Sequence, residues 1–99
     1  MSTVTHTLTA PIQAHGEEVK ELTLRRPTVQ ECRAIKALPY NLGESGYPVV
    51  DVEVAAKYIA VCATIPASSV NQLDLADLNA VAWLVVGFFM PRDSQQSAA

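Results

Sequence analysis

The 99-residue sequence predicts a single α+β domain, in which an N-terminal antiparallel β-hairpin is followed by about three α-helices. Three observations point to this fold class. Residues 4–12 largely alternate between apolar and threonine side chains, which is the two-residue period of a half-buried strand. Thr28, Asp51 and Asp74 each precede a segment with helical spacing of apolar residues, as N-cap residues do. Residues 80–90 form a run of eleven side chains without a polar group.

The hairpin is expected over about residues 4–25. On its first strand the apolar side chains share one face; they are Val4, Leu8, Ala10 and Ile12. Gly16 suits the turn because it adopts a positive φ without strain. In the second strand Val19 lies on the opposite parity to Leu22 and Leu24, so a bulge or a late start is expected. Other elements must cover the apolar face, since an isolated hairpin is only marginally stable.

The first helix is expected over residues 28–38. Residues 28–31 read Thr-Val-Gln-Glu and fit a capping box. Helical spacing gives an inward face of four residues, namely Val29, Cys32, Ile35 and Leu38. Pro39 ends this helix, and residues 40–48 are rich in turn-forming residues, so we expect a loop there, the most mobile interior segment.

The second helix is expected over residues 51–63, with Asp51 as its N-cap. Its inner face comprises Val52, Ala55, Ala56, Ile59 and Cys62. Tyr58 is expected at the rim of this face, with its hydroxyl exposed. Pro66 then breaks the chain, and a short helical turn is expected from Ser68 or Ser69.

The third helix is expected over residues 74–90, with Asp74 as N-cap and Asp77 favourably placed in the first turn. Its core face comprises Leu78, Val81, Ala82, Val85, Phe88 and Phe89. A second stripe contains Asn79, Trp83, Val86 and Met90, beside a ridge of small residues, Ala76, Ala80 and Gly87. This stripe is a candidate surface for a partner or for self-association, and the sequence leaves open whether it is core instead. Residues 91–99 are polar and small, as in a flexible tail.

The bulk composition excludes several classes of protein. A net charge of −3 and a pI near 5.2 argue against nucleic-acid binding. The charged fraction of 17% is low and favours a protein partner or a homo-oligomer. The apolar run at 80–90 is shorter than the roughly 20 residues of a membrane span. Without an apolar stretch near the N-terminus or a paired-cysteine motif, Cys32 and Cys62 are expected as buried, reduced thiols in the cytoplasm.

No motif for catalysis, a cofactor or a metal is visible, so we expect a protein that is not an enzyme. His6 is interpreted as a partly buried strand residue and His15 as an exposed turn residue. Residues 43–46 resemble the start of a nucleophile elbow, but Tyr47 replaces its second glycine. A basic cluster comprises Arg25, Arg26, Arg33 and Lys36. It is interpreted as a solvated surface, with contact to an acidic partner as the alternative.

Residues 8–35 combine an extended Leu-x-x-Pro-Ile, a glycine-centred turn and a Glu-Leu-x-Leu-Arg-x-Pro-Thr junction into a helix. An Ile-Pro break at 65–66 and a Leu-x-x-x-Asp helix start at 73–77 follow. Over residues 5–90 this layout resembles the small tail assembly chaperones of contractile-tailed, Mu-like and P2-like phages and prophages.

The resemblance implies a non-enzymatic helper in the host cytoplasm that binds the tape measure protein, a long helical rod prone to aggregation. It would keep this rod soluble while the tail tube assembles, and would be absent from the mature virion. The family also implies a longer, frameshifted form of the chain as a further partner. Two alternatives remain open: a structural tail or baseplate-associated protein, and a small DNA-binding regulator with a helix-turn-helix at 51–63 and its neighbour.

Overall fold

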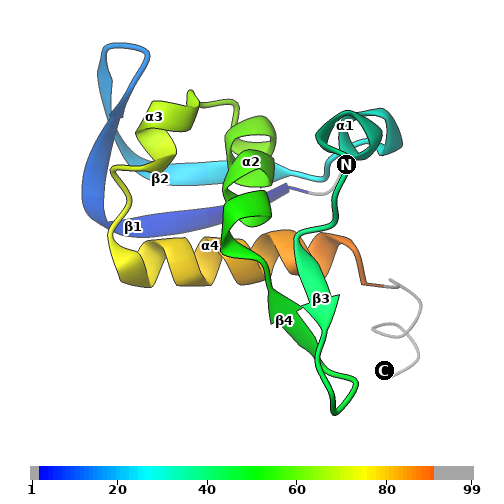
Figure 1. Cartoon of the computed structure of the whole chain (residues 1–99). Coiled ribbons are helices and arrows are strands. Elements are labelled where there is room, and N and C mark those ends of the chain that lie inside the picture. The colour runs from blue at the N-terminus through cyan, green and yellow to red at the C-terminus, as the bar shows by residue number, and fades with distance from the viewer. Residues whose placement is uncertain (1–2, 91–99) are drawn as a thin grey trace.

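The computed structural model describes residues 3–90 and confirms the predicted α+β class (Figure 1). An antiparallel hairpin is followed by four helices and a second, short hairpin within these residues. The elements are β1 (Thr3–Ala14), β2 (Glu17–Arg25), α1 (Val29–Ile35), β3 (Tyr40–Leu42), β4 (Pro48–Val50), α2 (Val52–Ala63), α3 (Ala67–Val70) and α4 (Leu75–Phe88). The tail expected at residues 91–99 lies outside the described part of the chain.

β1 and β2 form the predicted hairpin, paired from Thr3 opposite Arg25 to Ala14 opposite Glu17. His15 and Gly16 make the turn with φ of 56° and 78°, the conformation that favours a two-residue hairpin loop. The expected irregularity is present, but the extra residues belong to β1, not to β2. Residues 8–11 lie between two paired positions that are separated on β2 by Lys20 alone. This bulge leaves part of β1 without a strand partner.

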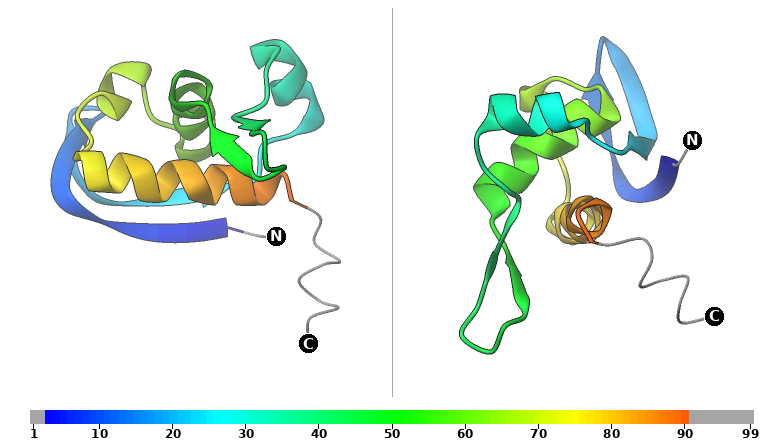
Figure 2. Two further views of the ribbon diagram at one scale, coloured as in Figure 1. Left: turned by 60° about the horizontal axis from the view of Figure 1, so that its bottom comes forward. Right: turned by 90° about the vertical axis from the view of Figure 1, so that its right-hand side faces the viewer.

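The hydrophobic core lies between one face of this hairpin and the helices. Figure 1 shows α2 crossing β2 and α4 running beside β1, and Figure 2 shows the helices on one side of the hairpin. The buried core residues are Leu8, Ile12, Leu22, Leu24, Tyr58, Ile59, Cys62, Val70, Leu73, Val81, Val85 and Phe88. The alternation predicted for β1 is therefore confirmed, with its threonines on the exposed face.

α1 begins with the predicted capping box but is shorter than expected. The backbone N–H of Glu31 donates to Thr28 Oγ1 at 3.1 Å, and the N–H of Thr28 donates to Glu31 Oε1 at 2.9 Å. The helix ends at Ile35, since Lys36 adopts the left-handed conformation with φ of 70°. Pro39 disfavours helical geometry at the residue before it, Leu38, so the helix does not continue to residue 38 as expected. The inward orientation predicted for Val29 and Leu38 is wrong, because both side chains are exposed.

The segment expected as a loop at residues 40–48 instead contributes to the β3–β4 hairpin, which projects from the body of the domain (Figure 2). The N–H of Gly43 donates to the carbonyl of Tyr47 at 2.8 Å, and Gly46 supplies the positive φ of the turn. The base of this hairpin is held by an edge-to-face contact between the rings of Tyr40 and Phe89, whose centroids are 6.3 Å apart.

α2 follows its predicted cap, as Asp51 Oδ1 accepts from the N–H of Val54 at 3.2 Å. Two details of its predicted inner face are wrong. Val52 is exposed at the first helical position. Tyr58 is fully buried, and its hydroxyl donates to the carbonyl of Ala37 at 2.6 Å. Burial raises the pKa of this hydroxyl. Because the carbonyl of Ala37 accepts this hydrogen bond, the buried hydroxyl is not left without a partner.

α3 is the short helical turn that was expected, although it begins at Ala67 and not at Ser68 or Ser69. Ser69 fixes it to β1 by donating to the carbonyl of Gln13 at 2.6 Å. α4 begins at its predicted cap, where Asp74 Oδ2 accepts from the N–H of Ala76 at 3.0 Å. Its predicted core face is confirmed, with Leu78 and Phe89 partly buried and the other members buried. None of the helices between residues 3 and 90 has the length and apolar character needed to span a bilayer.

Candidate protein-binding surfaces

The stripe singled out on α4 divides between surface and core. Trp83 is 45% exposed, Asn79 is exposed and Met90 is partly exposed. Val86 is only 2% exposed and packs inside the domain, so it offers no surface to a partner. Leu75, one turn before Asn79, is 80% exposed. The outer face of α4 therefore consists of Leu75, Asn79, Trp83 and Met90.

The ridge of small residues borders this outer face. A Cβ added at Gly87 would meet no atom within 4 Å, so no other part of the described chain covers this position. Ala76 is exposed and Ala80 partly exposed. The ridge beside the outer face of α4 therefore carries only small side chains, and the helix has no charged side chain from residue 78 to residue 90.

A second surface, which the sequence did not reveal, is a groove of about 310 Å³ between the end of β2, α1 and the C-terminal end of α4. We call it the α1–α4 groove. Its lining residues are Arg26, Pro27, Thr28, Val29, Cys32, Arg33, Leu38, Phe88 and Phe89. Val29 is 77% exposed and Leu38 is 46% exposed, so apolar atoms face the solvent around the groove. The one signal in the sequence was Pro39, which disfavours helical geometry at Leu38 and so argues against a helix that reaches this residue.

One ion pair, between Arg25 and Glu31, lies beside the α1–α4 groove. Arg25 donates to both carboxylate oxygens of Glu31, at 2.9 Å and 2.7 Å. This pairing, together with the N–H of Thr28, lowers the pKa of Glu31 to about 2. Arg26 lies over the ring of Phe88, with its guanidinium carbon 5.9 Å from the ring centroid, which is a cation–π contact. Two residues of the basic cluster predicted from the sequence therefore make internal contacts: Arg25 pairs with Glu31, and Arg26 contacts the ring of Phe88.

Both cysteines are free thiols, as expected, but the burial expected for both is confirmed for Cys62 alone. Cys32 is partly exposed and lines the α1–α4 groove. Cys62 is buried in the core, and burial raises the pKa of its thiol to about 11. The two thiols therefore differ in their expected reactivity toward an alkylating reagent.

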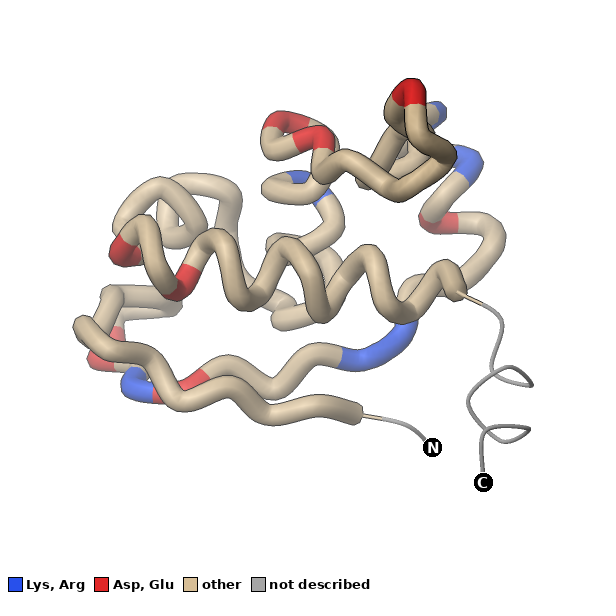
Figure 3. Tube along the Cα trace, turned by 90° about the horizontal axis from the view of Figure 1, so that it is seen from below, with Lys and Arg blue, Asp and Glu red and all other residues tan. Residues whose placement is uncertain are grey.

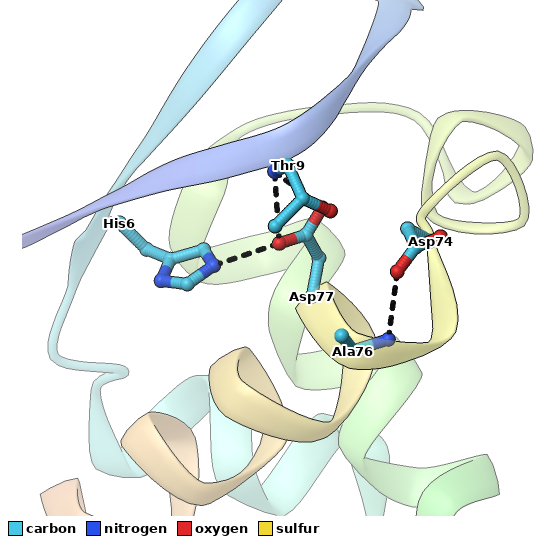
Figure 4. Close-up of polar contacts among 5 residues, drawn as sticks. All are labelled: His6, Thr9, Asp74, Ala76 and Asp77. Carbon is cyan, nitrogen blue, oxygen red and sulfur yellow. Dashed lines mark hydrogen bonds and ion pairs between the residues drawn. The ribbon is translucent and has the colours of Figure 1, made fainter.

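The two histidines have separate structural roles. His6 Nε2 lies 3.1 Å from Asp77 Oδ1, which joins β1 to the start of α4 (Figure 4). His15 is exposed in the hairpin turn, as expected, and its Nε2 donates to the carbonyl of Thr64 at 3.0 Å. Among residues 3–90, no group of three or more His, Cys, Asp and Glu side chains is arranged to hold a metal ion.

Comparison with known proteins identifies the family. No curated protein and no solved structure matches this chain. A family model described as phage tail assembly chaperone proteins, E, or 41 or 14, matches residues 5–90. This match covers all but the first two residues of the β1–β2 hairpin, together with the β3–β4 hairpin and the helices, and so includes both candidate surfaces. The chain belongs to the phage tail assembly chaperone family.

Proposed function

We propose that this tail assembly chaperone binds the tape measure protein and keeps it soluble while the tail is built. Membership of the family implies protein partners in tail assembly. A long helical rod exposes apolar stripes until tube subunits surround it, and a chaperone must cover those stripes reversibly. The role requires an apolar binding surface and no catalytic group, cofactor or metal.

The observation that carries the proposal is the α1–α4 groove. Helix-in-groove recognition places the apolar face of an amphipathic helix against a hydrophobic channel. The groove offers the rings of Phe88 and Phe89 with the side chains of Val29 and Leu38 beside them. Its volume of about 310 Å³ suits a few anchoring side chains and leaves the rest of the client helix at the surface.

The outer face of α4 is proposed as a surface for self-association. Trp83 and Met90 expose apolar area there, and the neighbouring small residues allow a second helix to approach closely. In this proposal the homo-oligomer presents several α1–α4 grooves to one client rod. The chaperone acts in the host cytoplasm and leaves the particle before it is complete.

The test is co-expression of the chain with the tape measure protein of its own phage. Val29→Ser combined with Leu38→Ser removes two exposed apolar side chains from the groove. We expect capture of the tape measure protein to weaken by about tenfold or more, as for other interface anchors. Val52→Ser combined with Leu42→Ser is the matched control, because both residues are exposed but lie outside the groove. Equal capture of the tape measure protein by the wild-type chain, the groove variant and the control variant would refute binding at this groove.

Mass spectrometry of purified virions distinguishes this function from that of a structural tail protein. A chaperone that leaves the particle should be absent from the mature virion or present far below the amount of the tube subunit. Recovery of the chain in stoichiometric amounts would contradict the proposal.

A further inference from the structure

The α1–α4 groove has a charge opposite to that of the whole chain. The full sequence carries a net charge of −3, yet the groove is lined by Arg26 and Arg33 and by no acidic residue. Figure 3 shows the basic segments at the end of β2 and in α1, at the end of the molecule where α4 finishes. The groove therefore combines an apolar floor with a local excess of positive charge.

The arrangement of side chains keeps these two cations available. Glu31 is the acidic residue of α1, and Arg25 and the Thr28 N–H occupy its carboxylate. Within residues 3–90 the ion pairs are His6 with Asp77 and Arg25 with Glu31, so neither Arg26 nor Arg33 has an acidic partner there. The contact with Phe88 holds Arg26 beside the groove, while Arg33 is exposed in the last turn of α1.

We propose that the α1–α4 groove selects an amphipathic helix whose apolar stripe is flanked by Asp or Glu residues. The apolar side chains enter between Val29, Leu38 and Phe88, and the flanking carboxylates pair with Arg26 and Arg33. This inference rests on the proposed function and deepens it, because it names the class of client segment that the groove takes. It also predicts that basic segments of the same client are rejected.

Charge complementarity is the physical basis of this selectivity. Opposite charges at the edge of an apolar contact raise the association rate and fix the orientation of the bound helix. Like charges at the same positions oppose binding, which gives discrimination between helices of equal hydrophobicity. Because the arginines are at least partly exposed, salt should weaken the preference.

Three synthetic helical peptides of about 18 residues, or five turns, form the probes. They share one leucine stripe and differ only in flanking residues, which are Glu, Gln or Lys. The first readout is fluorescence polarisation of the labelled peptide with the full chain. The second readout is the rate of Cys32 alkylation, because this thiol lines the groove and a bound helix should shield it. Cys62, buried in the core, is the internal control for unfolding.

The expected order of affinity is Glu, then Gln, then Lys. Arg33→Glu should weaken binding of the Glu peptide by about five- to tenfold and strengthen binding of the Lys peptide. Lys57→Glu is the matched control, since it makes the same charge change at an exposed position of α2 outside the groove. It should leave both affinities within about twofold, as expected for a remote exposed charge.

Equal binding of the three peptides with protection of Cys32 would overturn the charge selectivity while leaving the proposed apolar groove intact. Binding that never protects Cys32 would place the ligand elsewhere and overturn both. Protection of Cys32 without peptide, rising with protein concentration, would assign the groove to a second copy of the chain. Protection that is independent of concentration and lost on removal of residues 91–99 would assign it to that segment. Either result would overturn the proposal.

Discussion

The backbone N–H of Thr9 donates hydrogen bonds to both carboxylate oxygens of Asp77, at 3.1 Å and 2.9 Å (Figure 4). The hydroxyl of Thr9 donates to the same carboxylate at 3.0 Å. Thr9 lies in the bulge of β1, where the strand ladder with β2 is interrupted. Asp77 is 1% exposed, at the start of α4. A side chain from the last helix thus replaces the missing strand partner in the first strand.

Asp77→Asn should lower the free energy of unfolding by about 2–3 kcal/mol, because the partly buried donors of Thr9 and His6 lose the buried, charged acceptor that they share. Asp74→Asn removes the same charge three residues earlier, but asparagine remains a good N-cap, so its effect should stay below about 0.5 kcal/mol. Urea denaturation of the two variants makes the comparison. Equal stability of both would show that the buried carboxylate contributes no more than an exposed cap.

Protonation of two carboxyl groups, those of Asp77 and Glu31, should destabilise the fold at acidic pH. Burial alone would raise the pKa of Asp77, but hydrogen bonds from His6 and Thr9 outweigh it and hold that pKa below the ordinary value of 3.8. The pKa of Glu31 is lowered from 4.5 to about 2. The folded state therefore binds fewer protons than the unfolded state, and stability present at neutral pH is lost as the pH falls below about 4.5.

The same urea experiment, repeated at several pH values, tests this dependence. Asp77→Asn combined with Glu31→Gln should flatten the profile between pH 4.5 and about 2, because both depressed carboxyl groups are gone. An unchanged slope in the double variant would assign the acid sensitivity to other carboxyl groups.

Tyr58→Phe should destabilise the fold by about 1–2 kcal/mol, because the partly buried carbonyl of Ala37 loses the hydroxyl that donates to it at 2.6 Å. The ring contact with Phe89, at 5.2 Å between centroids, remains in this variant. Tyr47→Phe serves as the control, since Tyr47 is exposed at the tip of the β3–β4 hairpin. Thermal unfolding of the two variants should differ clearly, and equal midpoints would contradict a role for the Tyr58 hydroxyl.

Trp83→Ala combined with Met90→Ala should reduce self-association while leaving the fold largely intact, because neither side chain is fully buried. Val86→Ala, on the same helix but in the core, should instead cost about 2 kcal/mol of stability. Light scattering over a range of concentrations measures the association, and circular dichroism the fold. A monomeric wild-type chain at high concentration would refute the predicted homo-oligomer. If the double change unfolds the domain, this face is core.

The sequence predicted the features that depend on neighbours a few residues away. Alternation along β1 identified its buried face, and the caps at Thr28, Asp51 and Asp74 each accept a backbone hydrogen bond from the next turn. These interactions form within one helical turn or one strand, so their residues lie close together in the chain. The resemblance carried by residues 5–90 identified the family for the same reason, since it rests on the order of such local elements.

Tertiary packing decided the rest. A helical wheel showed two apolar faces on α4, and only the position of the other elements determined that Val86 is buried and Trp83 exposed. The partner of Asp77 lies 68 residues away, and the α1–α4 groove joins segments from the end of β2 to the end of α4. Contacts between distant segments depend on how the whole chain packs, because each apolar face can be covered by more than one element. The sequence by itself thus determined the β1–β2 hairpin, the main helices and their N-caps, whereas the β3–β4 hairpin and the surfaces that remain for a partner depend on the tertiary structure.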